Sequence, residues 1–104
     1  MPRVAFKMKL FPGVEAEYEK RHDRLWPELK DLLKNSGIND YSIFFDHQTG
    51  FLFACLSIDE TAKLDDLRDS TIMKKWWDYM KDLMDTNPDG SPVAIPLKEV
   101  FYLQ

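Results

Sequence analysis

Residues 41–58, YSIFFDHQTGFLFACLSI, decide the fold of this chain. The first part of the stretch is aromatic and β-branched, and Tyr41, Ile43 and Phe45 share one face because side chains alternate along a strand. The next four residues, HQTG, are typical of a turn, and residues 51–58 form a second strand-like run. Two such runs around a short turn predict a β-hairpin in the middle of the chain.

The chain before the hairpin predicts a strand and then a helix. Residues 3–10 alternate between polar and apolar side chains, as a half-buried strand does. Over residues 14–35 the apolar residues recur at spacings of three and four, which predicts an amphipathic helix. Pro27 lacks an N–H and clashes with the preceding turn, so we expect a kink, or two helices meeting, near residues 23–27. Gly37 is placed to close the helical segment as a left-handed cap.

The chain after the hairpin predicts two further helices and a last strand. Residues 61–69 have the pattern of a short charged helix, and Ser70 is placed to cap the helix that follows. That helix carries an apolar stripe at helical spacing. The stripe consists of Met73, Trp76, Trp77, Met80, Leu83 and Met84. Residues 87–92 contain two prolines and predict a loop, and residues 98–103 predict the final strand.

The order strand, helix, hairpin, helix, strand is that of the ferredoxin-like β-α-β-β-α-β unit. The sequence therefore predicts an α+β fold, with a four-stranded antiparallel sheet and helices on one face only. The length of 104 residues fits one domain over residues 1–104. The other sheet face needs a cover, and at this size a second copy of the sheet is the simplest one. We therefore expect a homodimer with two sheets face to face, a dimeric α/β barrel.

The composition argues against several classes of function. The formal net charge of −4 disfavours general binding to nucleic acid or to an anionic membrane. Cys55 is the only cysteine, which excludes an intrachain disulfide and a thiolate metal cluster and fits a reducing cytoplasm. Neither a signal-peptide run nor a bilayer-spanning stretch is visible. The common nucleophile, phosphate and metal motifs are missing too, so we expect no cofactor and no metal.

His22 is the residue that points most directly to chemistry. Tyr18, His22 and Trp26 follow one another at a spacing of four on the apolar stripe of the first helix, so they can face one pocket. Histidine exchanges protons near neutral pH, which suits general acid–base catalysis. The same position also suits a core histidine whose ring bonds to a backbone carbonyl, and spacing alone does not separate these interpretations.

Trp76 and Trp77 are the second candidate for a binding site. Adjacent residues of a helix point about 100° apart, so one ring can fill the core while the other borders an opening. Indole rings pack on the C–H faces of sugars and keep an N–H free to donate a hydrogen bond. A purely structural apolar stripe looks the same, and Tyr41 allows the same two interpretations.

Four stretches together resemble the L-rhamnose mutarotase family. They are residues 18–29 (YEKRHDRLWPEL), 41–46 (YSIFFD), 75–89 (KWWDYMKDLMDTNPD) with an extension to Pro92, and 99–103 (EVFYL). The resemblance runs essentially from one end of the chain to the other. Lys75 stands where some relatives have an arginine, a difference that concerns a surface ion pair.

The resemblance implies a cofactor-free enzyme of the dimeric α/β barrel fold that interconverts the α and β anomers of L-rhamnose. His22 matches the proton donor proposed for the family. The positions that match its sugar-contacting residues are Tyr18, Tyr41, Trp76 and Trp77. We expect His22 to donate a proton to the ring oxygen, with a tyrosine or a bound water completing the relay. The sequence does not assign the base.

Three other functions fit the same topology, because one fold supports unrelated activities. A monooxygenase of the dimeric α/β barrel type, acting on haem or an aromatic polyketide, would use His22 as an axial ligand. A non-catalytic module that senses a small metabolite would bind sugar without changing anomer exchange. A purely structural dimerisation domain is the third.

Overall fold

The computed structural model describes residues 2–59 and 64–104. In this part of the chain the strands are β1 (Arg3–Lys9), β2 (Ile38–Phe45), β3 (Phe51–Ile58) and β4 (Ile95–Leu97). The helices are α1 (Glu15–Asp23), α2 (Pro27–Asn35), α3 (Leu64–Arg68) and α4 (Thr71–Met80). The predicted beginning of a short helix at Thr61 lies outside the described residues.

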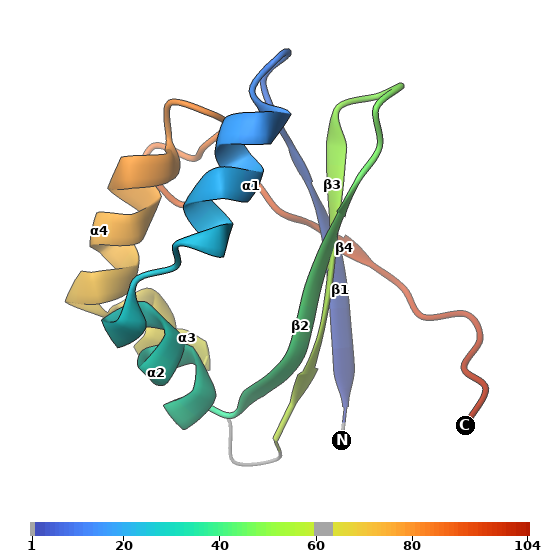
Figure 1. Ribbon diagram of the computed structural model, residues 1–104. Coiled ribbons are helices and arrows are strands. Elements are labelled where there is room, and N and C mark those ends of the chain that lie inside the picture. The colour runs from blue at the N-terminus through green and yellow to red at the C-terminus, as the bar shows by residue number, and fades with distance from the viewer. Residues whose placement is uncertain (1, 60–63) are drawn as a thin grey trace.

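The strands form one antiparallel sheet in the order β2-β3-β1-β4. The described helices lie against one face of this sheet, and the chain after β4 runs off on the opposite side (Figure 1). One helical segment connects β1 to β2 and the other connects β3 to β4. This arrangement confirms the predicted α+β fold with a β-α-β-β-α-β order.

The first helical segment is divided at Pro27, as the sequence predicts. Pro27 is the first residue of α2, where its missing N–H costs nothing. Trp26 has φ −58° and ψ 132°, the extended conformation that the residue before a proline prefers. Gly37 follows α2 with φ +88°, which confirms the left-handed cap.

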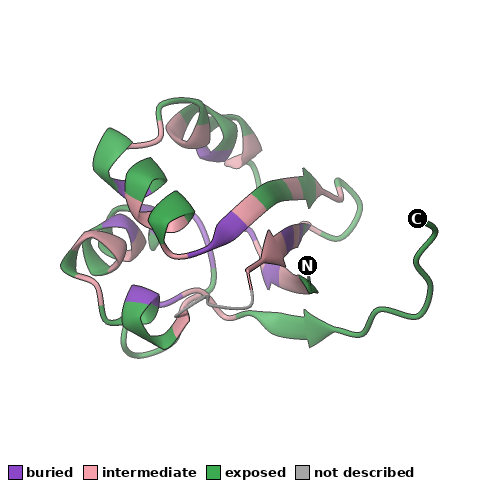
Figure 2. Ribbon diagram, turned by 90° about the horizontal axis from the view of Figure 1, so that it is seen from below, coloured by how far each residue is buried: buried purple, intermediate pink, exposed green. Residues whose placement is uncertain are grey.

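The core lies between the sheet and the helices, where the buried residues of both layers meet (Figure 2). Leu10, Leu29 and Leu52 are each no more than 2% exposed. Met8 and Met84 are buried in the same cluster. A fully buried leucine side chain stabilises the folded chain by about 1.5–3 kcal/mol, so this cluster is the main support of the helix layer.

The C-terminal strand lies earlier than the sequence predicts, and the expectation of a strand over residues 98–103 is wrong. β4 pairs with β1 over only three residues, with Pro96 at the centre opposite Phe6. An edge strand tolerates a proline because only one of its sides is paired. In the described chain residues 98–104 pair with no strand, and Arg3 instead holds them through an ion pair with Glu99 at 2.9 Å.

Two expectations for the last helix are also corrected. α4 ends at Met80, so Leu83 and Met84 are not helical. They are still buried in the core, because the chain turns after α4. Met84 forms an isolated β-bridge with Leu10, the residue that follows β1. Ser70 does occupy the N-cap position of α4, but its side chain makes no capping hydrogen bond.

The open sheet face is apolar in its middle. Phe44, Phe53, Lys7 and Ile95 follow one another across the sheet from β2 to β4, in paired positions. Phe44 is 68% exposed, and Phe53, Ile95 and Leu97 are exposed as well. A row of exposed aromatic and aliphatic side chains of this kind marks a surface suited to binding another protein surface.

Candidate active site

α1, α4 and the residue that precedes α2 bring four aromatic rings together. The rings of Tyr18 and His22, one turn apart on α1, lie 4.3 Å apart between centroids. Trp76 of α4 meets His22 edge-on at 5.4 Å and Trp26 edge-on at 5.1 Å. The three residues Tyr18, His22 and Trp26, which the sequence places on the stripe of one helix, are therefore divided between α1 and the residue before α2. The Trp76 ring contacts both His22 and Trp26.

The His22 ring is held by the backbone of its own helix. Its Nδ1 lies 3.0 Å from the carbonyl oxygen of Tyr18, one turn earlier in α1. Burial lowers the pKa of His22, and the Tyr18 carbonyl and the Asp23 carboxylate oppose this only in part. His22 is therefore a neutral imidazole at neutral pH, able to accept a proton as well as to return one.

Tyr41 reaches the same region from β2 through an irregularity of that strand. The pairing of β2 with β3 shifts register between Asn39 and Ser42, and Asp40 in between has φ +52°. Such a bulge bends a strand and redirects the side chains beside it. The Tyr41 residue is 40% exposed, yet burial of its hydroxyl end raises the pKa of Tyr41 to about 12.

The phenols of Tyr18 and Tyr41 are close enough to influence each other. Burial raises the pKa of Tyr18, and the nearby Tyr41 phenol raises it further. Both groups therefore keep their protons across the physiological pH range and serve as hydrogen-bond donors. The structure thus brings together Tyr18, His22, Trp76 and Tyr41 of the residues singled out in the sequence.

Trp77 lies apart from this group. Its ring faces the Arg68 guanidinium of α3 at 5.8 Å, and it packs against the edge of the core. Trp76 is 7% exposed and Trp77 is half-buried, in agreement with the expectation that adjacent helical residues face different surroundings. In the described chain, ring contacts join Trp76 to His22 and do not join Trp77 to it.

Arg21, which the sequence analysis did not single out, fixes α1 against α4. Its Nη1 donates to the carbonyl oxygen of Tyr79 at 2.7 Å and to Asp82 at 2.9 Å, and its Nε donates to Glu17 at 2.8 Å. The guanidinium also lies 4.3 Å from the centroid of the Tyr79 ring. The helical spacing of Glu17 and Arg21 is visible in the sequence, whereas the partner Asp82 is not.

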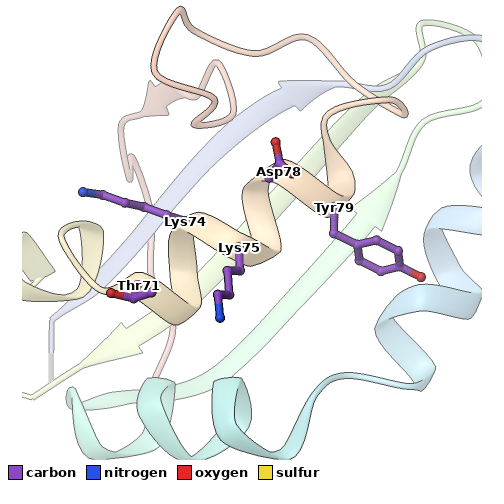
Figure 3. Close-up of a pocket in the computed structure, with 5 residues that line it drawn as sticks. All are labelled: Thr71, Lys74, Lys75, Asp78 and Tyr79. Carbon is purple, nitrogen blue, oxygen red and sulfur yellow. The ribbon is translucent and has the colours of Figure 1, made fainter.

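An open hollow of about 490 Å³ lies on the outer side of α4. It is lined by Thr71, Lys74, Lys75, Asp78 and Tyr79, and the Tyr79 side chain points toward α1 (Figure 3). None of the site residues predicted from the sequence lines this hollow. Its long exposed side chains make it a groove of the helix surface, and it adjoins the aromatic group through the Tyr79 ring, 5.7 Å from Trp26 and 5.8 Å from Trp76 between centroids.

The loop over residues 87–92 satisfies its own polar groups. The Ser91 hydroxyl donates to Asp89 at 2.6 Å, and the Asn87 amide donates to the Ser91 hydroxyl at 3.0 Å. Ser91 itself is buried. These bonds give the loop a fixed shape without any ligand.

Among residues 2–59 and 64–104, no three histidine, cysteine or acidic side chains are grouped as a metal site requires. In the same part of the chain, every helix is too short or too polar to cross a membrane.

Comparison with known proteins gives one consistent result. The family model described as L-rhamnose mutarotase matches residues 3–103. An L-rhamnose mutarotase of Formosa agariphila is 54% identical over 104 residues, all of both chains, and one of Bacteroides thetaiotaomicron is 55% identical over 103 residues, 99% of each chain. A crystal structure of an L-rhamnose mutarotase from Formosa agariphila, 53% identical, superposes with a TM-score of 0.93 and covers both chains completely.

Proposed function

The chain belongs to the L-rhamnose mutarotase family, and we propose on this basis that it interconverts the α and β anomers of L-rhamnose. The family match favours this activity over the haem-dependent monooxygenase, the metabolite-binding module and the dimerisation domain. The reaction needs no cofactor, because it consists of ring opening, one bond rotation and ring closure. Opening breaks the bond between C1 and the ring oxygen, closure forms it again, and each is accompanied by two proton transfers. All of these steps also occur slowly in water.

Mutarotation places modest demands on an active site. Ring opening removes the proton of the anomeric hydroxyl and adds a proton to the ring oxygen. The carbonyl group then rotates about the bond between C1 and C2, and closure on its other face reverses the two transfers. One positioned acid–base group is expected to accelerate such a reaction by about 10² to 10⁴-fold.

The observation that carries this proposal is the His22 imidazole, half-buried between Tyr18 and Trp76. Its Nδ1 is bonded within α1, and in the described chain its Nε2 bonds to no protein atom. A neutral imidazole with one free nitrogen beside aromatic rings suits proton exchange with a sugar hydroxyl. We assign the acid–base role in the active site to His22.

The aromatic residues supply the binding surface in this proposal. Trp76 offers its ring to the apolar side of the sugar, including the C6 methyl group of a deoxy-sugar. Tyr18 and Tyr41 present phenols that stay protonated and can donate to sugar oxygens. Trp77 remains a sugar-contacting candidate on the family resemblance alone, because its ring lies apart from the aromatic group, beside Arg68 of α3.

Exchange NMR on L-rhamnose at anomeric equilibrium tests the proposal. Inversion of one anomeric proton signal should transfer to the other anomer when a catalytic amount of protein is added. The His22→Gln variant should lose this transfer, whereas His47→Gln should keep it, because His47 lies in the hairpin turn against Phe45. The activity is refuted if the wild-type protein leaves the buffer rate unchanged, and the role of His22 is refuted if His22→Gln retains full exchange while folded.

We also propose that residues 1–104 form one domain that acts as a homodimer in the cytoplasm. The exposed row of Phe44, Phe53 and Ile95 on the open sheet face supports a face-to-face pairing of two sheets. A single cysteine, Cys55, suits a reducing compartment. Sedimentation at micromolar protein concentration tests the dimer, and a purely monomeric species there would overturn it.

A further inference from the structure

We propose that Asp40 is a positioning residue of this active site, because its left-handed backbone places the Tyr41 side chain on the sheet face that the helices cover. Its importance for the reaction rests on the proposed function, in which the Tyr41 phenol donates to a sugar oxygen. The Asp40 side chain is exposed, so the role belongs to the backbone conformation and not to the carboxylate.

β2 contains one residue more than a regular strand would need. Ile38, at its start, is buried with Leu56 of β3 and Leu67 of α3, on the helix side of the sheet. Ile43 of the same strand packs against the main core on that side too. Side chains alternate along a regular strand, so two residues five positions apart lie on opposite faces. Both isoleucines face the helices only because an extra residue lies between them.

The pairing with β3 places this extra residue directly before Tyr41. β2 pairs with β3 on both sides of residues 40–41, and these two residues lie opposite a single residue of β3, Leu56. Two residues opposite one constitute a β-bulge. Tyr41 lies two positions before Ile43 and therefore shares its face toward the helices.

Asp40 supplies the backbone conformation of this bulge. In the described part of the chain it is the residue other than glycine whose φ is positive, at +52°. Glycine, asparagine and aspartate adopt this left-handed conformation far more readily than other residues, and β-branched residues avoid it. One common type of bulge has its first residue in the same conformation. Substitutions at position 40 can therefore be divided by backbone preference, independently of charge.

The Tyr41 phenol depends on this placement. Burial raises the pKa of Tyr41 to about 12. Burial also raises the pKa of Tyr18 on α1, and the nearby Tyr41 phenol raises it further, so the two hydroxyls are neighbours. If the chain continued from Ile38 as a regular strand, Tyr41 would instead face the open side of the sheet, away from Tyr18 and His22.

Four substitutions of Asp40 separate the backbone role from the charge. Asp40→Asn and Asp40→Gly remove the carboxylate and keep a residue that tolerates positive φ. Asp40→Ala and Asp40→Val also remove it but disfavour positive φ, valine more strongly. We expect the first two variants to resemble the wild type and the last two to misplace Tyr41. Far-UV circular dichroism shows which variants are folded, and Asp40→Ala serves if Asp40→Val does not fold.

Carbon-13 NMR of tyrosines labelled at Cζ reports the position of the Tyr41 phenol without reference to activity. A Tyr41→Phe variant identifies its signal among those of the four tyrosines. In the wild type, Asp40→Asn and Asp40→Gly, the Tyr41 phenol should remain mostly protonated at about pH 11. In Asp40→Ala and Asp40→Val the phenol meets water and should ionise near its ordinary pKa of about 10. A folded Asp40→Val protein with a protonated Tyr41 at that pH would overturn the inference.

The dependence of anomer exchange on rhamnose concentration tests the role of Asp40 in the reaction. Tyr41→Phe loses one hydrogen bond to the sugar and should raise KM about 3- to 10-fold with little change in kcat. Asp40→Val should raise KM to a similar extent. The double variant Asp40→Val/Tyr41→Phe should be no worse than Tyr41→Phe alone, because both changes act through one phenol. Losses that add in the double variant would overturn the positioning role, since Asp40 would then act on something other than Tyr41.

The outcomes distinguish this inference from the proposed function. If Asp40→Asn is as impaired in exchange as Asp40→Val, the carboxylate itself matters and the backbone role is overturned. Exchange that is equal in the wild type and in folded Asp40→Val would overturn it as well. The absence of wild-type exchange would overturn the proposed function, whereas the ionisation of Tyr41 would still decide whether Asp40 positions this side chain.

Discussion

Replacing Arg21 with methionine is expected to lower the free energy of unfolding by about 2–5 kcal/mol. The Arg21 side chain is 12% exposed, and methionine keeps the packing of its aliphatic part. The lost bond to the Tyr79 carbonyl joins a charged donor to a backbone acceptor, which contributes about 1.5–3 kcal/mol. The lost ion pairs reach Glu17 and Asp82, whose side chains are 45% and 63% exposed, so each contributes only about 0.2–1 kcal/mol.

Urea unfolding followed by tryptophan fluorescence measures this loss, at one protein concentration for every variant. Arg24→Met is the matched control, because Arg24 ends the same helix and is exposed, and its change should stay within about 0.5 kcal/mol. Sodium chloride screens the ion pairs, so it should reduce the difference in unfolding free energy between wild type and Arg21→Met by the contribution of the ion pairs alone. If Arg21→Met is no less stable than Arg24→Met, the contacts of Arg21 with Tyr79 and Asp82 do not stabilise the fold.

Three further predictions concern pH, the core and the open sheet face. Because burial lowers the pKa of His22, the unfolded chain binds this proton more readily than the folded one, so the free energy of unfolding should rise with pH up to about 6.5 and then level off. Urea titrations between about pH 5 and 7 should show this slope reduced in His22→Gln, and an identical slope would contradict it. Leu52→Ala, at a site 2% exposed, should cost about 2–5 kcal/mol in the same assay, and a cost below about 1 kcal/mol would show that the site is not tightly packed. Phe44→Asp should turn the proposed dimer into a monomer in sedimentation while Lys74→Glu on the helix side does not, and equal behaviour of the two variants would exclude the open face as the interface.

Much of the fold could be predicted because its signals are local. The hairpin follows from side-chain alternation on both sides of residues 47–50, and this pattern needs no information from elsewhere in the chain. The break at Pro27 follows from the ring of a single residue, and the left-handed Gly37 follows from its missing Cβ. With strands and helices in the correct order, the connection rules leave few topologies to choose from.

The features that were missed depend on partners distant in sequence. Residues 98–103 have strand-like composition, but a strand forms only where a neighbour offers hydrogen bonds, and β1 pairs with residues 95–97 instead. Leu83 is as buried as the helical stripe suggests, yet the chain has already left the helix. Asp82 lies 61 residues from Arg21, and no local pattern connects them. The bulge that directs Tyr41 depends in the same way on the pairing of two strands.

One hydrogen bond of His22 is compatible with both interpretations that the sequence left open. A core histidine bonded to a backbone carbonyl and a histidine that exchanges protons with a substrate looked like alternatives. In the structure, the Tyr18 carbonyl satisfies Nδ1 at 3.0 Å and thereby determines that Nε2 is the nitrogen with the lone pair. The helix thus both stabilises the ring and sets its tautomer, much as a second group orients a catalytic base in other acid–base sites. It follows that a substitution which distorts α1 near Tyr18 should alter catalysis even when the His22 side chain itself is untouched.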